Sequence, residues 1–214
     1  MTLKNILTIV GCVVITNQAI AGSLPDPRNF PIGQPTLQCV EQAAHDHKVP
    51  FALLLGVNSI ERGKTGQNVG NSNGSLDTGA FQINSIHFAR AKKLNASHGD
   101  LASRGCYNAQ FAAMLLSEAL SQKSKQHLDI YTRGAGYHSW TPKYNAIYRK
   151  KLVKYTNEWQ VWLNNNAPTQ QYNVNSPQEP TQQYRNQGVQ HVNYQREPNP
   201  FLSGFIGQTS TSHQ

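Results

Sequence analysis

Acidic residues are scarce in this chain of 214 residues, which has 11 aspartates and glutamates against 19 lysines and arginines and a formal net charge of +8. Few carboxylates are therefore available for a paired catalytic acid and base. Beyond the N-terminus no apolar run approaches the length of a membrane span, so we expect no stable membrane insertion. Phosphate-cradling glycine motifs are absent, and the histidines show no zinc-ligand spacing, so we expect no metal and no cofactor. The histidines considered are His45, His47, His87, His98, His127 and His138.

The first residues hold a single cation at Lys4, an apolar run over residues 6–15, and small residues at Ala19 and Ala21. This pattern predicts a secretory signal peptide over residues 1–21, cleaved after Ala21. The alternative is a lipoprotein-type cleavage that leaves Cys12 acylated, but the Ala-x-Ala site lies downstream and favours the first interpretation. We therefore expect a soluble, exported protein in the periplasm.

Cysteine is rare, with three in the chain. Removal of residues 1–21 takes Cys12 away and leaves Cys39 and Cys106. In an exported protein, two remaining cysteines predict one disulfide. Two buried free thiols are the alternative.

The most informative stretch covers residues 58–84, NSIERGKTGQNVGNSNGSLDTGAFQIN, and places Glu61 between an apolar helix and a polar, glycine-rich loop. Apolar neighbours disfavour the charged carboxylate, so we expect a raised pKa for Glu61. A carboxylic acid that is still protonated near neutral pH can protonate a glycosidic oxygen. The loop offers short neutral side chains suited to sugar hydroxyls and acetamides, and we expect Gly63 to stop the helix just after the acid.

Glu61 and the later segment NGSLDTGAFQIN, residues 73–84, together resemble the signature of the soluble lytic transglycosylases, goose-lysozyme relatives that cleave peptidoglycan. The resemblance covers roughly residues 37–160 and is strongest to the accessory enzymes of type IV secretion and conjugation systems. It implies a mainly α, lysozyme-like (SLT) domain with a small loop or β region at the substrate cleft. Two positions depart from the pattern: Arg62 replaces the usual Ser, and GAGYHSW at residues 134–140 replaces a Tyr-Asn-Ala-Gly turn.

The resemblance implies that Glu61 protonates the leaving oxygen of the β-1,4 bond between N-acetylmuramic acid and N-acetylglucosamine. Glu61 then removes the C6 hydroxyl proton, which gives a 1,6-anhydro end without water. A second carboxylate is not needed, and Asp77 has a structural role in this scheme, with its carboxylate bonded to loop amides. The candidate substrate-binding residues are Ser75, Gln82, Asn84 and Tyr137, with Phe81 expected to pack in the core.

Two other functions stay open. A non-catalytic peptidoglycan-binding assembly factor would result if Arg62 paired with Glu61 and kept it charged. A muramidase would hydrolyse the same bond and leave reducing ends. Glycan strands are the expected partner in every case, because a basic protein attracts a polymer that carries stem-peptide carboxylates. The densest basic stretch, residues 149–154, lacks nucleic-acid motifs and is interpreted as a solvated helix face, so we expect no nucleic acid.

Composition divides the mature chain into three parts. Prolines predict an extended arm over residues 22–36. Apolar residues at helical spacing predict one domain over residues 37–163. We expect the first helix to start near Thr36 and further helices to cover residues 51–62, 85–94 and 108–126. Two more helices are expected after these, separated by a turn at residues 140–142.

Residues 164–214 are rich in Gln, Asn, Pro, Ser and Thr, which predicts a disordered tail. Within it, the apolar segment at residues 200–206 is either a docking motif for a partner or an inert patch. The partner would be a component of an envelope-spanning secretion, conjugation or pilus apparatus, and nothing in the sequence selects among these machines. We expect the protein itself to be a monomer.

Overall fold

The computed structural model describes residues 24–166; the predicted signal peptide, Cys12 and the tail beyond residue 166 lie outside the described residues. This part is mainly α-helical with a small three-stranded antiparallel sheet, so the predicted mainly α class with a small β region is confirmed. The helices are α1 Leu37–Asp46, α2 Phe51–Glu61, α3 Phe88–Lys93, α4 His98–Ser103, α5 Gly105–Ser121, α6 Ile130–Gly134 and α7 Pro142–Asn166. Short 3-10 helices are η1 Pro27–Asn29, η2 Ser85–His87, η3 Lys123–Lys125 and η4 Ala135–Tyr137. The strands are β1 Asn68–Gly70, β2 Leu76–Thr78 and β3 Ile83–Asn84, in the order β1-β2-β3.

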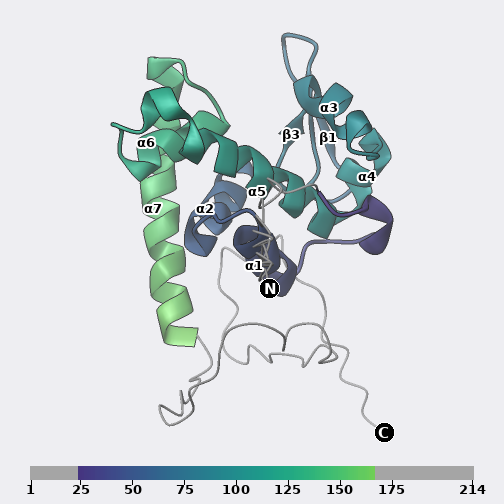
Figure 1. Ribbon diagram of the computed structural model, residues 1–214, viewed down its shortest axis with the longest axis horizontal. Helices are drawn as coiled ribbons and strands as arrows, with labels where there is room; N and C mark the ends of the chain where they lie inside the picture. Colours follow the sequence, from purple (N-terminus) through teal and green to yellow (C-terminus); the bar gives the residue numbers. More distant parts are fainter. Residues whose placement is uncertain (1–23, 167–214) are drawn as a thin grey trace, which may run out of the picture.

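Helix α5 runs through the middle of the molecule (Figure 1). The sheet, α3 and α4 lie on one side of it, and α6 and α7 lie on the other. Helix α1 packs against α5, and α2 packs along α7. The C-terminal end of α2 is thereby held by a helix that starts some eighty residues later in the chain.

Two helices supply much of the core because most of their residues are apolar and buried. Every residue of α2 from Ala52 to Ser59 is buried, and α5 buries large side chains such as Phe111 and Leu116. A helix that is apolar all round is stable only where other elements cover it. Trp159 of α7, which is 1% exposed, contributes to that cover and donates a hydrogen bond to Ser59 Oγ at 2.8 Å.

The N-terminal segment is bonded to the domain along its length rather than simply leading into it. The predicted extended arm contains a turn, η1, whose cap Asp26 accepts hydrogen bonds from the backbone and side chain of Arg28. Further along, Gly33 N–H donates to Ser103 O at 2.9 Å, and Gly33 O accepts from Gly105 N–H at 2.8 Å. This arm therefore forms part of the packed structure at the start of α5.

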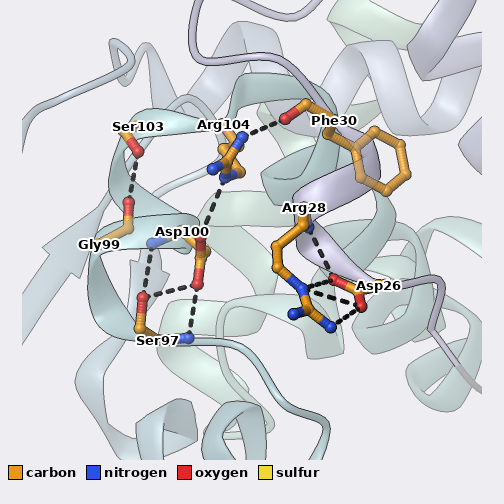
Figure 2. Close-up of polar contacts among 8 residues, drawn as sticks. All are labelled: Asp26, Arg28, Phe30, Ser97, Gly99, Asp100, Ser103 and Arg104. Atoms are coloured by element: carbon orange, nitrogen blue, oxygen red, sulfur yellow. Dashed lines mark hydrogen bonds and ion pairs between the residues drawn. The ribbon is translucent and has the colours of Figure 1, made fainter.

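Arg104 joins the arm to α4, as Figure 2 shows. Its guanidinium donates to Phe30 O and, at 3.0 Å, to Asp100 Oδ1. Asp100 in turn accepts from the backbone of Ser97, whose hydroxyl caps α4 through the Asp100 N–H. One charged side chain thus ties the arm to a capped helix.

The predicted disulfide is confirmed. Cys39 and Cys106 are bonded, with 5.6 Å between their Cα atoms. Cys39 lies in the first turn of α1, which Thr36 caps by accepting from the Cys39 N–H, and Cys106 lies in the first turn of α5. The bond therefore fixes two helix starts beside the docked arm.

Several element boundaries differ from the prediction. Helix α4 was not predicted, because its six residues are too few to show a helical period. Helix α5 ends at Ser121 rather than at residue 126, since the backbone of Gln122 turns to ψ 109° before η3. Helix α7 continues to Asn166, three residues beyond the predicted domain end at residue 163. Within residues 24–166 no helix is both long and apolar enough to cross a membrane.

Candidate active site at the end of helix α2

Glu61 is the last residue of α2 and is half-buried. Its Oε1 accepts a hydrogen bond from the hydroxyl of Tyr148 at 2.6 Å, and Tyr148 is a buried residue of α7. The pKa of Glu61 is raised from 4.5 to about 7, chiefly by burial and to a smaller extent by the charge of Asp77. The Tyr148 hydrogen bond and the charge of Lys151 lower this pKa by less, so desolvation dominates. Glu61 is therefore a carboxyl group that exchanges a proton near neutral pH.

The helix stop after Glu61 differs from the prediction. Arg62, rather than Gly63, takes the left-handed conformation that ends α2, with φ 51°. Gly63 is needed for a different reason: a Cβ at this position would lie 2.1 Å from Gly79 O and 2.6 Å from Gln82 Nε2. The glycine permits the turn after β2 to approach the chain directly behind the acid.

Arg62 does not form an ion pair with Glu61 that would keep the carboxylate charged. Its guanidinium donates to the hydroxyl of Tyr155 on α7 at 3.1 Å. Among the ion pairs of residues 24–166, none joins Arg62 to Glu61. The contact that would support a non-catalytic protein is therefore not formed.

A buried asparagine holds the turn after β2, which lies against Gly63. Asn108 of α5 is 0% exposed, accepts from Phe81 N–H at 2.7 Å, and donates to Thr78 O at 3.1 Å and Leu101 O at 2.9 Å. Asn58 of α2 donates to Ala80 O at 3.0 Å. Each buried amide satisfies backbone groups that would otherwise lack partners. The segment after β2 is thereby fixed to α2 and α5 together.

Tyr137 hydrogen-bonds to the turn after β2 rather than to Glu61, and its predicted place in the substrate cleft stays a prediction. Its hydroxyl donates to Phe81 O at 2.9 Å, and Phe81 itself is fully buried, as expected for a packing residue. Burial holds the pKa of Tyr137 well above its usual value, with a further rise from the charge of Glu61. Tyr137 is therefore a neutral donor that anchors the turn beside the acid.

The hairpin of β1 and β2 is organised around the carboxylate of Asp77. Oδ2 accepts from Asn71 Nδ2 at 2.9 Å, and Oδ1 accepts from Asn84 Nδ2 at 2.7 Å. Both amides also donate to Ser75 Oγ at 3.0 Å. The structure thus gives Asp77 the bonds of a structural residue, as the sequence predicted, although the donors are side-chain amides.

The predicted substrate-binding residues are brought to one region, and their sugar contacts stay a prediction. Asn84 donates directly to Ser75 Oγ and to Asp77, so in this structure these polar groups connect β3 to the hairpin. Gln82 has a left-handed backbone, φ 50°, and donates to Gly79 O at 2.9 Å. Its amide lies against Gly63, two positions after the acid.

Sequence reasoning missed Tyr148, the residue in direct contact with the acid. The ring of His138 stacks on Tyr148 with 5.0 Å between centroids and 7° between planes, so these two residues form one wall beside Glu61. The signal that could have found Tyr148 is its place on the buried face of the last helix, which also carries Leu152 and Trp159 at helical spacing. Across the described residues, no group of three histidine, cysteine, aspartate or glutamate side chains is arranged to hold a metal.

Fold and site together define a mainly α-helical protein in which the half-buried Glu61 has a pKa of about 7. A hairpin rich in side-chain amides follows Glu61 in the chain. No protein-family profile matches the chain. Two curated relatives, both named protein IpgF, come from Shigella flexneri and Shigella sonnei; each is 37% identical to the chain over 82 residues. Those residues are 37% of this chain and 53% of each relative, so the chain spans about half the length of the curated relatives it matches.

Proposed function

We propose that the protein is a lytic transglycosylase that cleaves the β-1,4 bond between N-acetylmuramic acid and N-acetylglucosamine in peptidoglycan. The observation that carries the proposal is the state of Glu61: a carboxyl with a pKa of about 7, held in place by the Tyr148 hydroxyl at 2.6 Å. Such a group can give a proton to a glycosidic oxygen and later accept one. The resemblance of residues 61 and 73–84 to the transglycosylase signature supplies the substrate class.

In the proposed mechanism Glu61 donates its proton to the leaving oxygen as the glycosidic bond breaks. The N-acetyl group of the muramyl sugar stabilises the developing positive charge at C1. The Glu61 carboxylate then takes the proton of the C6 hydroxyl, and O6 closes on C1. Atoms balance without water, and the product carries a 1,6-anhydro end. Asp77 takes no part in these steps, because both of its oxygens accept hydrogen bonds from the side-chain amides of Asn71 and Asn84.

The resemblance and the predicted signal peptide also support a proposal for the cellular location and the biological role of the protein. The protein acts in the periplasm, where it opens the wall locally for an envelope-spanning machine. A muramidase remains the second candidate, since the same acid with an activated water would give reducing ends. The assembly-factor alternative is less favoured, because the guanidinium of Arg62 bonds to Tyr155 instead of Glu61.

Mass spectrometry of murein sacculi digested with the full-length protein tests the proposal. We expect muropeptides with 1,6-anhydro ends, and none after digestion with Glu61→Gln. Glu118→Gln is the matched control, because this exposed glutamate bonds Arg90 on α3 away from the site and should leave activity intact. Reducing ends would identify a muramidase, and the absence of any fragment would leave only the binding function.

A further inference from the structure

Lys151 lies on helix α7, about one turn after the residue that contacts the candidate acid. It follows Tyr148 by three positions, and residues three apart on a helix are neighbours on one face. Since the hydroxyl of Tyr148 contacts Glu61, this face of α7 borders the end of α2, along which α7 packs (Figure 1). The charge of Lys151 acts on both Glu61 and His138, which agrees with this placement.

The ammonium of Lys151 has no anion to neutralise it within the described part of the chain. Two other cations of α7 do have one: Arg149 pairs with Asp129 at 3.4 Å, and Lys154 pairs with Glu158 at 4.0 Å. Lys150, like Lys151, is in none of the ion pairs of residues 24–166. No ion pair of residues 24–166 includes Lys151, whose side chain is exposed. His138 does not share the positive charge near neutral pH, because burial lowers its pKa.

A free cation at this position works against the proposed chemistry. It stabilises the carboxylate form of Glu61, whereas a general acid must carry its proton when the substrate arrives. An anion bound to Lys151 would cancel this effect. The arriving substrate can supply that anion, because N-acetylmuramic acid differs from N-acetylglucosamine by a lactyl arm that ends in a carboxyl group or carries a peptide with carboxylates.

We propose that Lys151 binds a carboxylate carried on the lactyl arm of the muramyl sugar, and so selects acid-bearing amino-sugar strands over neutral chitin-like strands. This inference rests on the proposed function, because it names the substrate group that the same site recognises. Pairing with the substrate also offsets the charge of Lys151, which opposes protonation of Glu61. Lys151 is thereby a specificity residue whose partner is the substrate.

Binding measurements on the full-length protein with Glu61→Gln, which prevents turnover, test the inference. The probes are three tetrasaccharides: chitotetraose, the peptide-free dimer of GlcNAc-MurNAc, and the same dimer with its stem peptides. We expect the acid-bearing probes to bind more tightly than chitotetraose. Adding Lys151→Met should weaken an acid-bearing probe about fivefold, the size of a favourable exposed ion pair, and leave chitotetraose unchanged.

Lys150→Met is the matched control, because it removes the same charge from an exposed neighbour that lies two residues, about 200° around the helix, from Tyr148. Lys151→Arg should retain the preference. A loss for the peptide-free dimer identifies the lactyl carboxylate as the bound group, and a loss confined to the peptide-bearing dimer identifies the peptide; both support the inference.

Two results would overturn the inference alone: equal weakening of all three probes by Lys151→Met, or no change in any of them. The same loss from Lys150→Met would overturn it as well, since net charge would then explain the effect. If the Glu61→Gln protein bound none of the probes, the proposed function would itself fail. The outcomes for chitotetraose and for the acid-bearing probes therefore separate the two failures.

Discussion

At the residue scale, the contact between Tyr148 and Glu61 determines how the acid behaves. The hydroxyl donates to the carboxyl at 2.6 Å, which favours the charged form, while burial favours the neutral form more strongly. The result is a pKa of about 7 instead of 4.5. The acid is thus protonated in an appreciable fraction of molecules at neutral pH and still able to release its proton.

Replacing Tyr148 by Phe should change both the rate and its pH dependence. Activity requires protonated Glu61, so it should fall as pH rises through about 7 in the native protein. Without the hydroxyl the pKa of Glu61 rises further, so the alkaline limb of kcat/KM should move to higher pH. Loss of orientation should also reduce kcat about tenfold or more.

The pH profile of murein cleavage measures both effects. Tyr155→Phe is the control, because Tyr155 lies on the same helix but bonds Arg62 rather than the acid. An alkaline limb that stays in place in Tyr148→Phe would show that the hydroxyl does not tune Glu61.

At the element scale, Asn108 connects α5 to the turn after β2. Its amide serves three backbone groups, on Phe81, Thr78 and Leu101, in a fully buried position. Replacement by Ala leaves these groups without partners, and each buried unpaired group costs about 1–3 kcal/mol. We expect Asn108→Ala to lower the free energy of unfolding by about 2–4 kcal/mol, measured by urea denaturation.

The exposed Asn157 of α7 supplies the comparison for this change, and Asn157→Ala should shift stability by less than about 0.5 kcal/mol. Murein cleavage by Asn108→Ala, measured where the protein is still folded, should also fall, because the turn that carries Gln82 loses its support. Wild-type stability in Asn108→Ala would contradict this account of the turn.

The sequence predicted those elements whose signals are local. Thr36 followed by an apolar period predicted the start of α1, and the apolar run before Glu61 predicted both α2 and the raised pKa. The contact of Tyr148 with Glu61 was not predicted, because it joins residues 87 apart in the sequence and depends on the packing of α7 on α2. The buried face of α7 also includes Asn145 and Thr156, which weaken the apolar pattern that marks such a face.

Gly63 shows a second limit of sequence reasoning. A glycine directly after a helix predicts a left-handed cap, yet Arg62 adopts that conformation and Gly63 makes room for Gly79 O. The reason for this glycine lies in a contact with a turn that comes sixteen residues later. Local sequence cannot distinguish a glycine needed for its backbone angle from one needed for the absence of a side chain.

At the scale of the whole molecule, the Cys39–Cys106 bond closes a loop with a sequence separation of 67. In the chain-entropy description, a loop of this length stabilises the folded state by about 4 kcal/mol. We expect the double variant Cys39→Ser, Cys106→Ser to unfold at lower urea concentration than the native protein, by a free energy of that order. When the unsubstituted protein is denatured without reduction, a thiol titration should find neither Cys39 nor Cys106 reactive. Two reactive thiols would contradict the bond.

The acid itself should reduce stability at alkaline pH. Below pH 4.5 Glu61 is protonated in both the folded and unfolded states, so it adds no pH dependence. Between pH 4.5 and about 7 the unfolded state ionises first, and the folded state therefore loses stability as pH rises. The loss levels off above pH 7 at about 3 kcal/mol, from a pKa difference between 4.5 and about 7.

Glu61→Gln keeps the acceptor for Tyr148 and removes the titration. Its advantage in stability over the native protein should thus grow by about this amount from pH 4 to pH 8, as measured by urea denaturation. An advantage that does not change with pH would mean that the carboxyl titrates alike in both states.

The central claim is that the surroundings of Glu61 raise the pKa of this one carboxyl to about 7, so that an appreciable fraction of it is neutral near physiological pH. A ¹³C NMR titration of the glutamate carboxyl carbons in the full-length protein measures this directly, with the Glu61 signal assigned by its absence in Glu61→Gln. The account predicts a midpoint near pH 7. A midpoint near the ordinary value of 4.5 would contradict it.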